Sequence, residues 1–167
     1  MTFFQVNYNQ AELLYDKIKE YLGSNNNKVL DLYCGTGSIG IYVSEGCKEV
    51  IGIEINKSSV RDANTNIELN DINNVRVIEG DVGRVLEFNT KYDAIIVDPP
   101  RSGLDKRTKN TLLEIRSNKI IYVSCDPITL ARDLKVLSEY YEVKDMILVD
   151  MFPNTYHVES VVLLKLK

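Results

Sequence analysis

Short β-branched segments alternate with segments of helical periodicity along nearly the whole chain. Strands that alternate with helices build a mostly parallel sheet covered by helices on both faces. The last two strands have no long helix between them, which favours an antiparallel pair at the end of the sheet. The sequence therefore predicts an α/β fold with a seven-stranded, mostly parallel sheet and an antiparallel last strand. The predicted strands are Val29–Leu32, Val50–Ile55, Val75–Glu79, Ala94–Asp98, Ile120–Ser124, Val143–Val149 and Val158–Leu166.

Apolar residues at helical spacing mark two helices most clearly. One stripe precedes the first strand and ends at Gly23, a residue typical of helix termination. Its members are Ala11, Leu14, Ile18 and Leu22. The other stripe follows the fifth strand directly, behind residues suited to the N-cap and the first turn. Asp126 and Pro127 are suited to these two positions. The stripe itself is Leu130, Leu134 and Leu137.

The composition is that of one ordinary domain. The chain has 167 residues, of which 44% are hydrophobic and 26% charged, with a formal net charge of -4. A chain of this length and apolar content forms one core, and no linker or repeat divides residues 1–167. No apolar run approaches the ~20 residues of a membrane helix, and the first residues do not resemble a signal peptide. We therefore expect a cytoplasmic protein with no membrane partner, and a monomer.

The three cysteines, Cys34, Cys47 and Cys125, are odd in number and lack C-x-x-C spacing. Neither a disulfide framework nor a thiolate metal site is therefore indicated. We expect reduced thiols and no bound metal.

A glycine-rich loop follows the first strand and opens a helix. It contains Gly35, Gly37 and Gly40, and Glu54 ends the second strand 19 positions after Gly35. A carboxylate at that place can accept hydrogen bonds from both hydroxyls of a ribose. NAD and S-adenosylmethionine both fit such a loop, but Asp31 at the end of the first strand would repel a pyrophosphate. Asp31 suits the cationic end of S-adenosylmethionine instead.

Each of these acidic residues also has an interpretation without a ligand. Asp31 can cap the backbone of the loop, and Glu54 can be a surface strand end. Asp81, after the third strand, can receive an adenine amino group, but aspartate is equally a good N-cap for the following segment.

The fourth strand ends in Asp98-Pro99-Pro100-Arg101. Two successive prolines fix the backbone and remove two donors, so that they form a stiff rim against which a substrate can bind. Ligand sites in open α/β sheets lie at the carboxyl ends of the strands. The end of the fifth strand should face the same crevice, and this placement would aim Cys125 at a substrate.

The reactivity of Cys125 is not determined by its neighbours in sequence. A helix N-terminus directly after it stabilises a thiolate, whereas Asp126 opposes the thiolate. The sign of the pKa shift therefore stays open. An inert buried cysteine is the alternative, and it is our default interpretation of Cys34 and Cys47.

Glu159 lies near the start of the last strand, on the same predicted face as Val161 and Leu163. Desolvation on a largely apolar face would raise its pKa and make it a proton acceptor. The alternative is an exposed strand start. His157, the single histidine, is a second candidate base, although a lone histidine is more often structural.

Residues 101–135 contain eight Lys and Arg against four Asp and Glu, so this segment is basic in an acidic chain. A polyanion would be attracted to it, but the cations can equally be the solvated faces of two helices.

Several segments together closely resemble the RNA 5-methyluridine methyltransferases, over nearly the whole chain. The segments around Cys125 and Glu159 are far more specific than the glycine loop. The segments are Phe4–Asn7, Asp31–Gly37, Asp98–Gly103, Tyr122–Asp133 and Asp150–Glu159.

The resemblance implies a Rossmann-like S-adenosylmethionine-dependent methyltransferase fold, an RNA substrate, either tRNA or rRNA, and the cofactor S-adenosylmethionine. It implies that Cys125 is the nucleophile that attacks uracil C6 and that Glu159 is the base that removes the C5 proton. The residues that resemble the family's cofactor contacts are Gln5, Tyr33, Ser38, Glu54 and Asp98.

Family members usually have an N-terminal RNA-binding barrel and a further region ahead of the Phe4-Gln5 motif, and this chain has neither. We therefore expect a catalytic domain excised from a longer protein, without the iron-sulfur cluster of some members. A cofactor-binding fragment that is inactive without its RNA-binding region is one alternative function. An NAD-dependent oxidoreductase is another, but it gives no role to Cys125 and Glu159 together. Enzymes that methylate exocyclic amino groups usually place an aromatic residue where this chain has Arg101.

Overall fold

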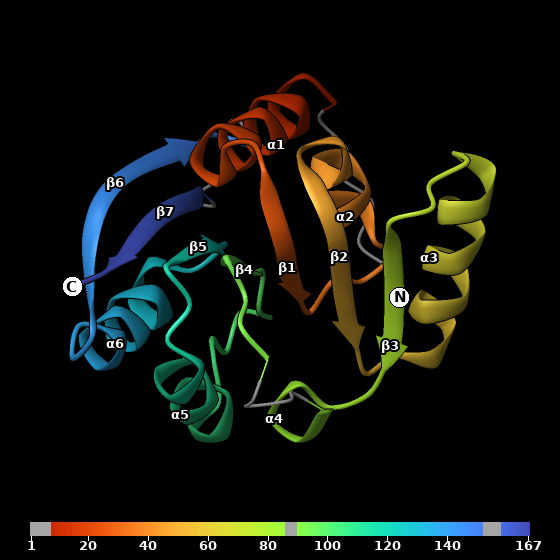
Figure 1. Cartoon of the computed structure of the whole chain (residues 1–167). Helices are drawn as coiled ribbons and strands as arrows, with labels where there is room; N and C mark the ends of the chain where they lie inside the picture. Colours follow the sequence, from red (N-terminus) through yellow and green to blue (C-terminus); the bar gives the residue numbers. More distant parts are fainter. Residues whose placement is uncertain (1–7, 86–89, 152–157) are drawn as a thin grey trace.

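The computed structural model describes residues 8–85, 90–151 and 158–167. Strands and helices alternate along most of the chain, as the sequence predicts (Figure 1). The helices are α1 (Tyr8–Leu22), α2 (Ser38–Val43), the 3-10 turn η1 (Ser44–Gly46), α3 (Lys57–Leu69), α4 (Val82–Val85), α5 (Lys106–Ile115) and α6 (Pro127–Leu137). The strands are β1 (Asn26–Leu32), β2 (Cys47–Glu54), β3 (Val75–Glu79), β4 (Ala94–Val97), β5 (Lys119–Ser124), β6 (Tyr141–Val149) and β7 (Glu159–Leu166).

All of these strands belong to one seven-stranded sheet in the order β3-β2-β1-β4-β5-β7-β6. The first five strands in chain order pair in parallel, and β7 pairs antiparallel with both β5 and β6. The predicted mixed sheet with an antiparallel last strand is confirmed. Because β7 inserts between β5 and β6, the outer edge of the sheet is β6 rather than the last strand.

Each face of the sheet is covered by its own set of helices (Figure 1). Val29 of β1 packs with Ile18 of α1 on one face, whereas its neighbour Leu30 packs with Leu112 of α5 and Leu130 of α6 on the other. All five side chains are buried. Central strands buried on both faces explain why their sequences are continuous apolar runs rather than alternating ones.

The helix boundaries follow from local hydrogen bonds. The side chains of Asn56, Asp105 and Asp126 each accept two backbone N–H groups at the start of α3, α5 and α6. Such N-caps satisfy donors that have no partner inside the helix. Gly23 ends α1 in the left-handed region, at a φ of 66°, and its N–H donates to the Lys19 carbonyl at 2.9 Å. Both helices predicted from apolar stripes are confirmed.

Two strands end one residue earlier than predicted. β2 ends at Glu54, and the next residue, Ile55, is 66% exposed. The Glu54 carboxylate accepts the N–H of Asn56 at 2.7 Å, which turns the chain out of the sheet toward α3. β4 likewise ends at Val97, so that Asp98 is the first residue beyond it. Both carboxylates therefore lie at the carboxyl edge of the sheet. In the described ranges no helix is long and apolar enough to cross a membrane.

Candidate active site

The register of β5 against β7 brings two distant segments together. Ser124, the last residue of β5, pairs with Ser160 of the antiparallel β7. The next residues outward at this end are therefore Cys125, after β5, and Glu159, at the start of β7. β4 lies on the other side of β5, so Asp98 reaches the same edge. The structure thus brings together the thiol and the two carboxylates that the sequence places at strand ends.

The environment of Cys125 gives the sign of its pKa shift, which its sequence neighbours leave open. Burial raises the pKa of the Cys125 thiol, and the charges of Glu159 and Asp98 add to the rise. Arg101 opposes the rise by its charge and by a hydrogen bond to the sulfur. The net shift is upward. The thiol of the unliganded protein is therefore harder to ionise than an ordinary cysteine, and Arg101 is the group that favours its thiolate.

Two carboxyl groups of this edge have raised pKa values. Burial raises the pKa of Glu159, and the charge of Arg101 opposes the rise. Burial raises the pKa of Asp98 to about 7, and the charges of Glu159 and Asp31 add to the shift. A carboxylate whose pKa is raised by desolvation is a stronger proton acceptor than one in water. The half-buried position and the raised pKa expected for Glu159 are found, and its role as a base stays a prediction.

Arg101 follows the proline pair in the loop between β4 and α5. Pro99 is buried, whereas Pro100 and Arg101 are exposed. The backbone is fixed by the Gly103 N–H, which donates to the Pro100 carbonyl at 2.8 Å, and by the Thr129 hydroxyl, which donates to the Arg101 carbonyl at 3.1 Å. The rim predicted at Asp98-Pro99-Pro100-Arg101 is therefore held in place by α6.

The glycine loop has three residues in the left-handed region: Tyr33 at a φ of 63°, Gly35 at 54° and Gly37 at 78°. Glycine adopts this conformation without strain, but a tyrosine does so at a cost of about 1 kcal/mol or more. The Glu54 carboxylate accepts the Gly35 N–H at 3.0 Å. Glu54 therefore holds the loop, and its contact with a ribose stays a prediction.

Asp31 is fully buried beneath the loop. Its Oδ2 accepts the N–H of Gly40 at 2.9 Å, so the capping role considered for this residue exists. Its Oδ1 is buried and has no hydrogen-bond partner among the described residues. Burial raises the pKa of Asp31 to about 7, the Gly40 hydrogen bond opposes the rise, and the charge of Glu54 adds to it. A buried acceptor without a donor is costly, and a cationic ligand would satisfy it.

Tyr15 is a residue of this site that sequence reasoning missed. It extends from α1, and its pKa is raised by burial and by the nearby charges of Asp98 and Asp31, against a hydrogen bond from Ser38. Ser38, predicted beside the cofactor, also lies within hydrogen-bond distance of the Thr36 hydroxyl, at 3.2 Å. The signal in the sequence was the position of Tyr15 beside the buried stripe of α1, where a side chain reaches the rim of the core.

The remaining candidates are less completely described. The Asp81 carbonyl accepts the N–H groups of Arg84 and Val85, so Asp81 opens the short helix α4, and its charge is close enough to raise the pKa of Tyr33. Gln5 and His157 lie outside the described residues. The roles of all the predicted site residues remain predictions. In the described part of the chain, no group of three or more His, Cys, Asp or Glu side chains could hold a metal ion.

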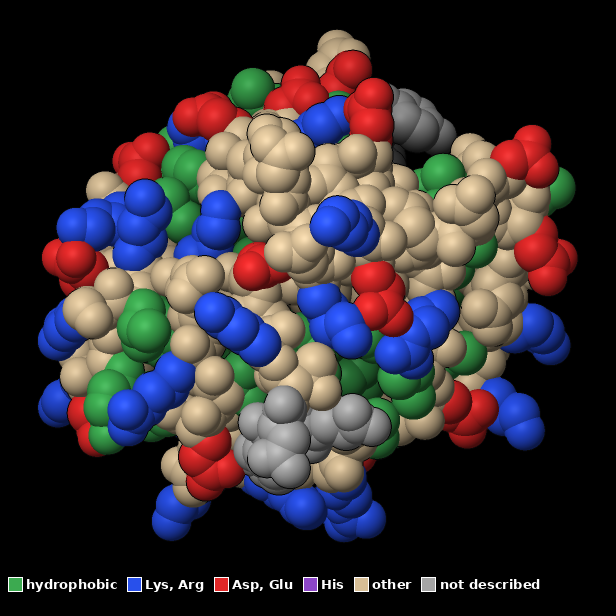
Figure 2. Space-filling view, in the orientation of Figure 1, with side chains coloured by type: hydrophobic (Ala, Val, Ile, Leu, Met, Phe, Trp, Pro, Cys, Tyr) green, Lys and Arg blue, Asp and Glu red, His purple; other side chains and the backbone are tan. Residues whose placement is uncertain are grey.

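The basic segment 101–135 is only partly a solvent-exposed surface. Lys109 and Arg132 form ion pairs with the buried Asp133, and Arg116 lies over the ring of Tyr140. Figure 2 shows Lys and Arg side chains interspersed with Asp and Glu on the face that it draws. Several of the cations counted in the sequence therefore have structural partners, which neither the attraction of a polyanion nor a purely solvated helix face describes.

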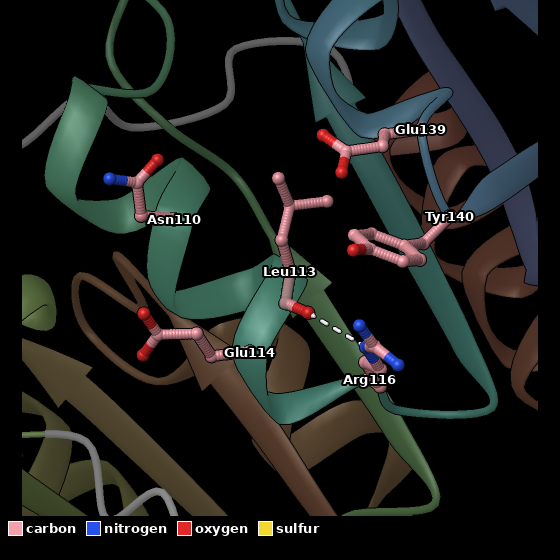
Figure 3. Close-up of a pocket in the computed structure, with 6 residues that line it drawn as sticks. All are labelled: Asn110, Leu113, Glu114, Arg116, Glu139 and Tyr140. Atoms are coloured by element: carbon pink, nitrogen blue, oxygen red, sulfur yellow. Dashed lines mark hydrogen bonds between the residues drawn. The ribbon is translucent and has the colours of Figure 1, made fainter.

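Two sizeable cavities lie elsewhere than between Cys125 and Glu159. One, of about 530 Å³, lies between α5 and the turn from α6 to β6, at the amino edge of the sheet (Figure 3). It is lined by Asn110, Leu113, Glu114, Arg116, Glu139 and Tyr140. In it the Arg116 guanidinium lies 4.1 Å from the centroid of the Tyr140 ring. The other, of about 690 Å³, lies along α3.

The fold is that of known methyltransferases. A dimethyladenosine transferase of Plasmodium falciparum superposes with a TM-score of 0.71 at 19% identity, over 92% of this chain and 61% of that one. A tRNA (uracil-54, C5)-methyltransferase of Pyrococcus abyssi, solved in complex with S-adenosyl-L-homocysteine, superposes with a TM-score of 0.88 at 37% identity, over 98% of this chain and 40% of that one. The class is therefore the Rossmann-like fold of S-adenosylmethionine-dependent methyltransferases, as the sequence resemblance implied.

The chain belongs to the tRNA (uracil-5-)-methyltransferase family, whose family model matches residues 83–167. A second family model, the methyltransferase small domain, matches residues 9–118. An uncharacterized RNA methyltransferase of Clostridium acetobutylicum is 48% identical over 99% of this chain, and one of Enterococcus faecalis is 45% identical over 98% of it. The chain spans 37% of the length of each of these relatives.

Proposed function

We propose that this chain is the catalytic domain of an RNA methyltransferase that transfers a methyl group from S-adenosylmethionine to C5 of a uridine in tRNA or rRNA. The single observation that carries the proposal is the placement of Cys125 and Glu159 beside each other, one position beyond the Ser124–Ser160 pair. Methylation of uracil C5 needs a nucleophile that adds to C6 and a base that removes the C5 proton, and this pair can supply both.

The residues of the glycine loop fit the proposed cofactor. S-adenosylmethionine supplies an electrophilic methyl group on a sulfonium, and it also has an ammonium group. The buried Asp31 Oδ1, which lacks a hydrogen-bond partner among the described residues, fits a cation. Asp98 is a second carboxyl, half-buried, and it is close enough to Asp31 for their charges to interact. A pyrophosphate would be repelled by both, which argues against the NAD-dependent alternative.

In the proposed reaction the Cys125 thiolate adds to C6 of the uracil. A sulfur–carbon bond forms, and the electrons of the C5–C6 double bond move onto the C4 carbonyl oxygen. This addition makes C5 a nucleophile, which would take the methyl group from the sulfonium of S-adenosylmethionine and leave S-adenosylhomocysteine. Arg101, which stabilises the Cys125 thiolate, is placed to assist the addition.

Glu159 then completes the reaction in this proposal. Its carboxylate accepts the proton of C5, the C5–C6 double bond re-forms, and Cys125 leaves as a thiolate. Burial of Glu159 supports this role, because it raises the carboxyl pKa and with it the affinity for the proton. A target base stacked in folded RNA would have to be extruded to reach the sulfur.

The relatives are longer than this chain. This chain spans 37% of the length of the two bacterial relatives, so we propose that it corresponds to their catalytic domain. The same coverage favours a second candidate function: a cofactor-binding domain that needs the rest of such a protein to act on RNA.

Trapping with RNA that contains 5-fluorouridine tests the proposal. A fluorine at C5 cannot be removed as a proton, so an active enzyme should remain covalently attached to the RNA after methyl transfer. We expect a band of reduced mobility on a denaturing gel, dependent on S-adenosylmethionine and lost in Cys125→Ala. The matched control is Cys47→Ala, on β2, which should still form the adduct.

The outcomes separate the candidates. An adduct that persists in Cys125→Ala would exclude Cys125 as the nucleophile. Binding of S-adenosylhomocysteine without any adduct would favour the cofactor-binding domain that needs further protein.

A further inference from the structure

Asp133 of α6 is a charged side chain with no exposure to solvent. Burying an unpaired carboxylate costs several kcal/mol or more, so a buried carboxylate is normally paired and hydrogen-bonded. Burial alone would raise the pKa of Asp133, but hydrogen bonds, first among them that of Lys109, outweigh it and the pKa is lowered. Asp133 is therefore an ionised group in the interior, and the mechanism proposed above does not use it.

The partners of Asp133 come from every element around it. Its Oδ2 accepts the Leu104 N–H at 2.7 Å and the Tyr122 hydroxyl at 2.9 Å. Its Oδ1 accepts Lys109 Nζ at 2.8 Å and Arg132 Nη2 at 3.0 Å. These bonds join α6 to β5, to α5 and to the loop after β4.

That loop is the one that contains Arg101, and α6 holds it by two further hydrogen bonds. Arg132 Nη2 donates to the Ser102 carbonyl at 2.7 Å, and the Thr129 hydroxyl donates to the Arg101 carbonyl. Gly103 lies so close that a Cβ built on it would overlap Asp133 Oδ2. The loop therefore rests directly on the carboxylate.

The same helix begins directly after Cys125. Asp126 is the N-cap of α6, so the position of α6 fixes the position of the thiol. A loop bound to α6 holds Arg101 beside Cys125. There the charge of Arg101 favours the thiolate form of Cys125. Asp133 touches neither the thiol nor Glu159 in any bond of the network.

We propose that Asp133 is a positioning residue, which binds the Arg101 loop to α6 and thereby keeps the Arg101 guanidinium beside Cys125. The inference rests on the proposed role of Cys125. Its test uses thiol chemistry that needs neither RNA nor cofactor, so it can fail while the proposed function stands.

The test is the pH profile of Cys125 alkylation by iodoacetamide, measured on the Cys125 peptide by mass spectrometry, in the whole chain. Asp133→Asn keeps the size of the side chain but removes its charge. We expect the profile to move upward by half a unit to one unit, which slows alkylation at neutral pH by about three- to tenfold. Arg101→Ala should move it in the same direction.

A double-mutant cycle shows whether Asp133 acts through Arg101. In the Arg101→Ala background, Asp133→Asn should produce little further shift. The structural control is Leu137→Ala, a buried position at the far end of α6, which should lower the melting temperature and leave the profile in place.

Two results would overturn the inference. One is an unchanged profile in Asp133→Asn, and the other is a full additional shift in the Arg101→Ala background. If Asp133→Asn does not fold, Arg132→Met serves instead, because Arg132 is 51% exposed and its loss releases only part of the loop. It should give a smaller upward shift that disappears in the Arg101→Ala background, and an unchanged profile would again overturn the inference.

Discussion

Cys125 and Glu159 lie beside each other because β7 runs antiparallel to β5, and each residue stands one position beyond the Ser124–Ser160 pair. A parallel last strand would place the start of β7 at the opposite edge of the sheet. The reversal of this strand therefore brings the proposed base to the proposed nucleophile. Arg101, from the loop after β4, acts on both groups.

Glu159→Gln should stop the reaction after methyl transfer. The amide cannot accept the C5 proton, so the methylated RNA should stay bound to Cys125, and turnover should fall by about 10²- to 10⁴-fold. A denaturing gel with ordinary uridine RNA would show the adduct accumulate. Glu142→Gln, at an exposed position on β6, is the matched control. Normal turnover in Glu159→Gln would assign the proton transfer to another group.

Glu54→Ala should strongly weaken binding of S-adenosylhomocysteine. Two charge-assisted hydrogen bonds to a ribose contribute roughly 1.5 to 3 kcal/mol each, so their loss weakens binding by about 10²-fold or more. Glu54 also holds the Gly35 N–H, which adds to the loss. Calorimetric titration measures the affinity for S-adenosylhomocysteine. A separate titration with NADH tests the alternative cofactor. The matched control is Glu79→Ala. Glu79 is the residue of β3 that pairs with Glu54 of β2. Preference for NADH would contradict the proposed cofactor.

Asp31 should make the unliganded protein less stable as the pH rises. Its folded pKa is raised to about 7, so between its unfolded pKa and about 7 the folded state binds more protons than the unfolded state. The free energy of unfolding should therefore fall with rising pH across that window, by roughly 2 to 4 kcal/mol from this group. Urea denaturation at about pH 5 and about pH 8 measures the fall, which should shrink in Asp31→Asn. An equal fall in both proteins would refute the assignment.

Gly103→Ala should destabilise the protein more than Gly23→Ala. Both glycines have a left-handed φ, 72° and 66°, which costs an alanine about 1 kcal/mol. A Cβ at Gly23 meets nothing within 4 Å, whereas one at Gly103 overlaps Asp133 Oδ2 and lies 2.6 Å from Arg132 Nη2. We expect about 2 to 4 kcal/mol for Gly103→Ala by thermal or urea denaturation. Equal costs would mean that the loop shifts without strain.

The alternation of strands and helices in the sequence was sufficient to predict the layered sheet, because each strand is a short apolar run bounded by turn residues. The same rule predicted that Glu54, Asp98 and Cys125 end at one edge, since parallel strands bring their carboxyl ends together. The order of β6 and β7 was not predictable, because a strand pair can join a sheet through either member.

The sequence alone determined which residues stand at the ends of the strands and which family they resemble, because both depend on local pattern. Only the tertiary structure decided how those residues affect one another. The upward pKa shift of Cys125 comes from burial, Glu159 and Asp98, and Arg101 opposes it. The ionised state of Asp133 depends on partners from three other parts of the fold. Electrostatic interactions depend on distance in space, and sequence spacing does not provide that distance.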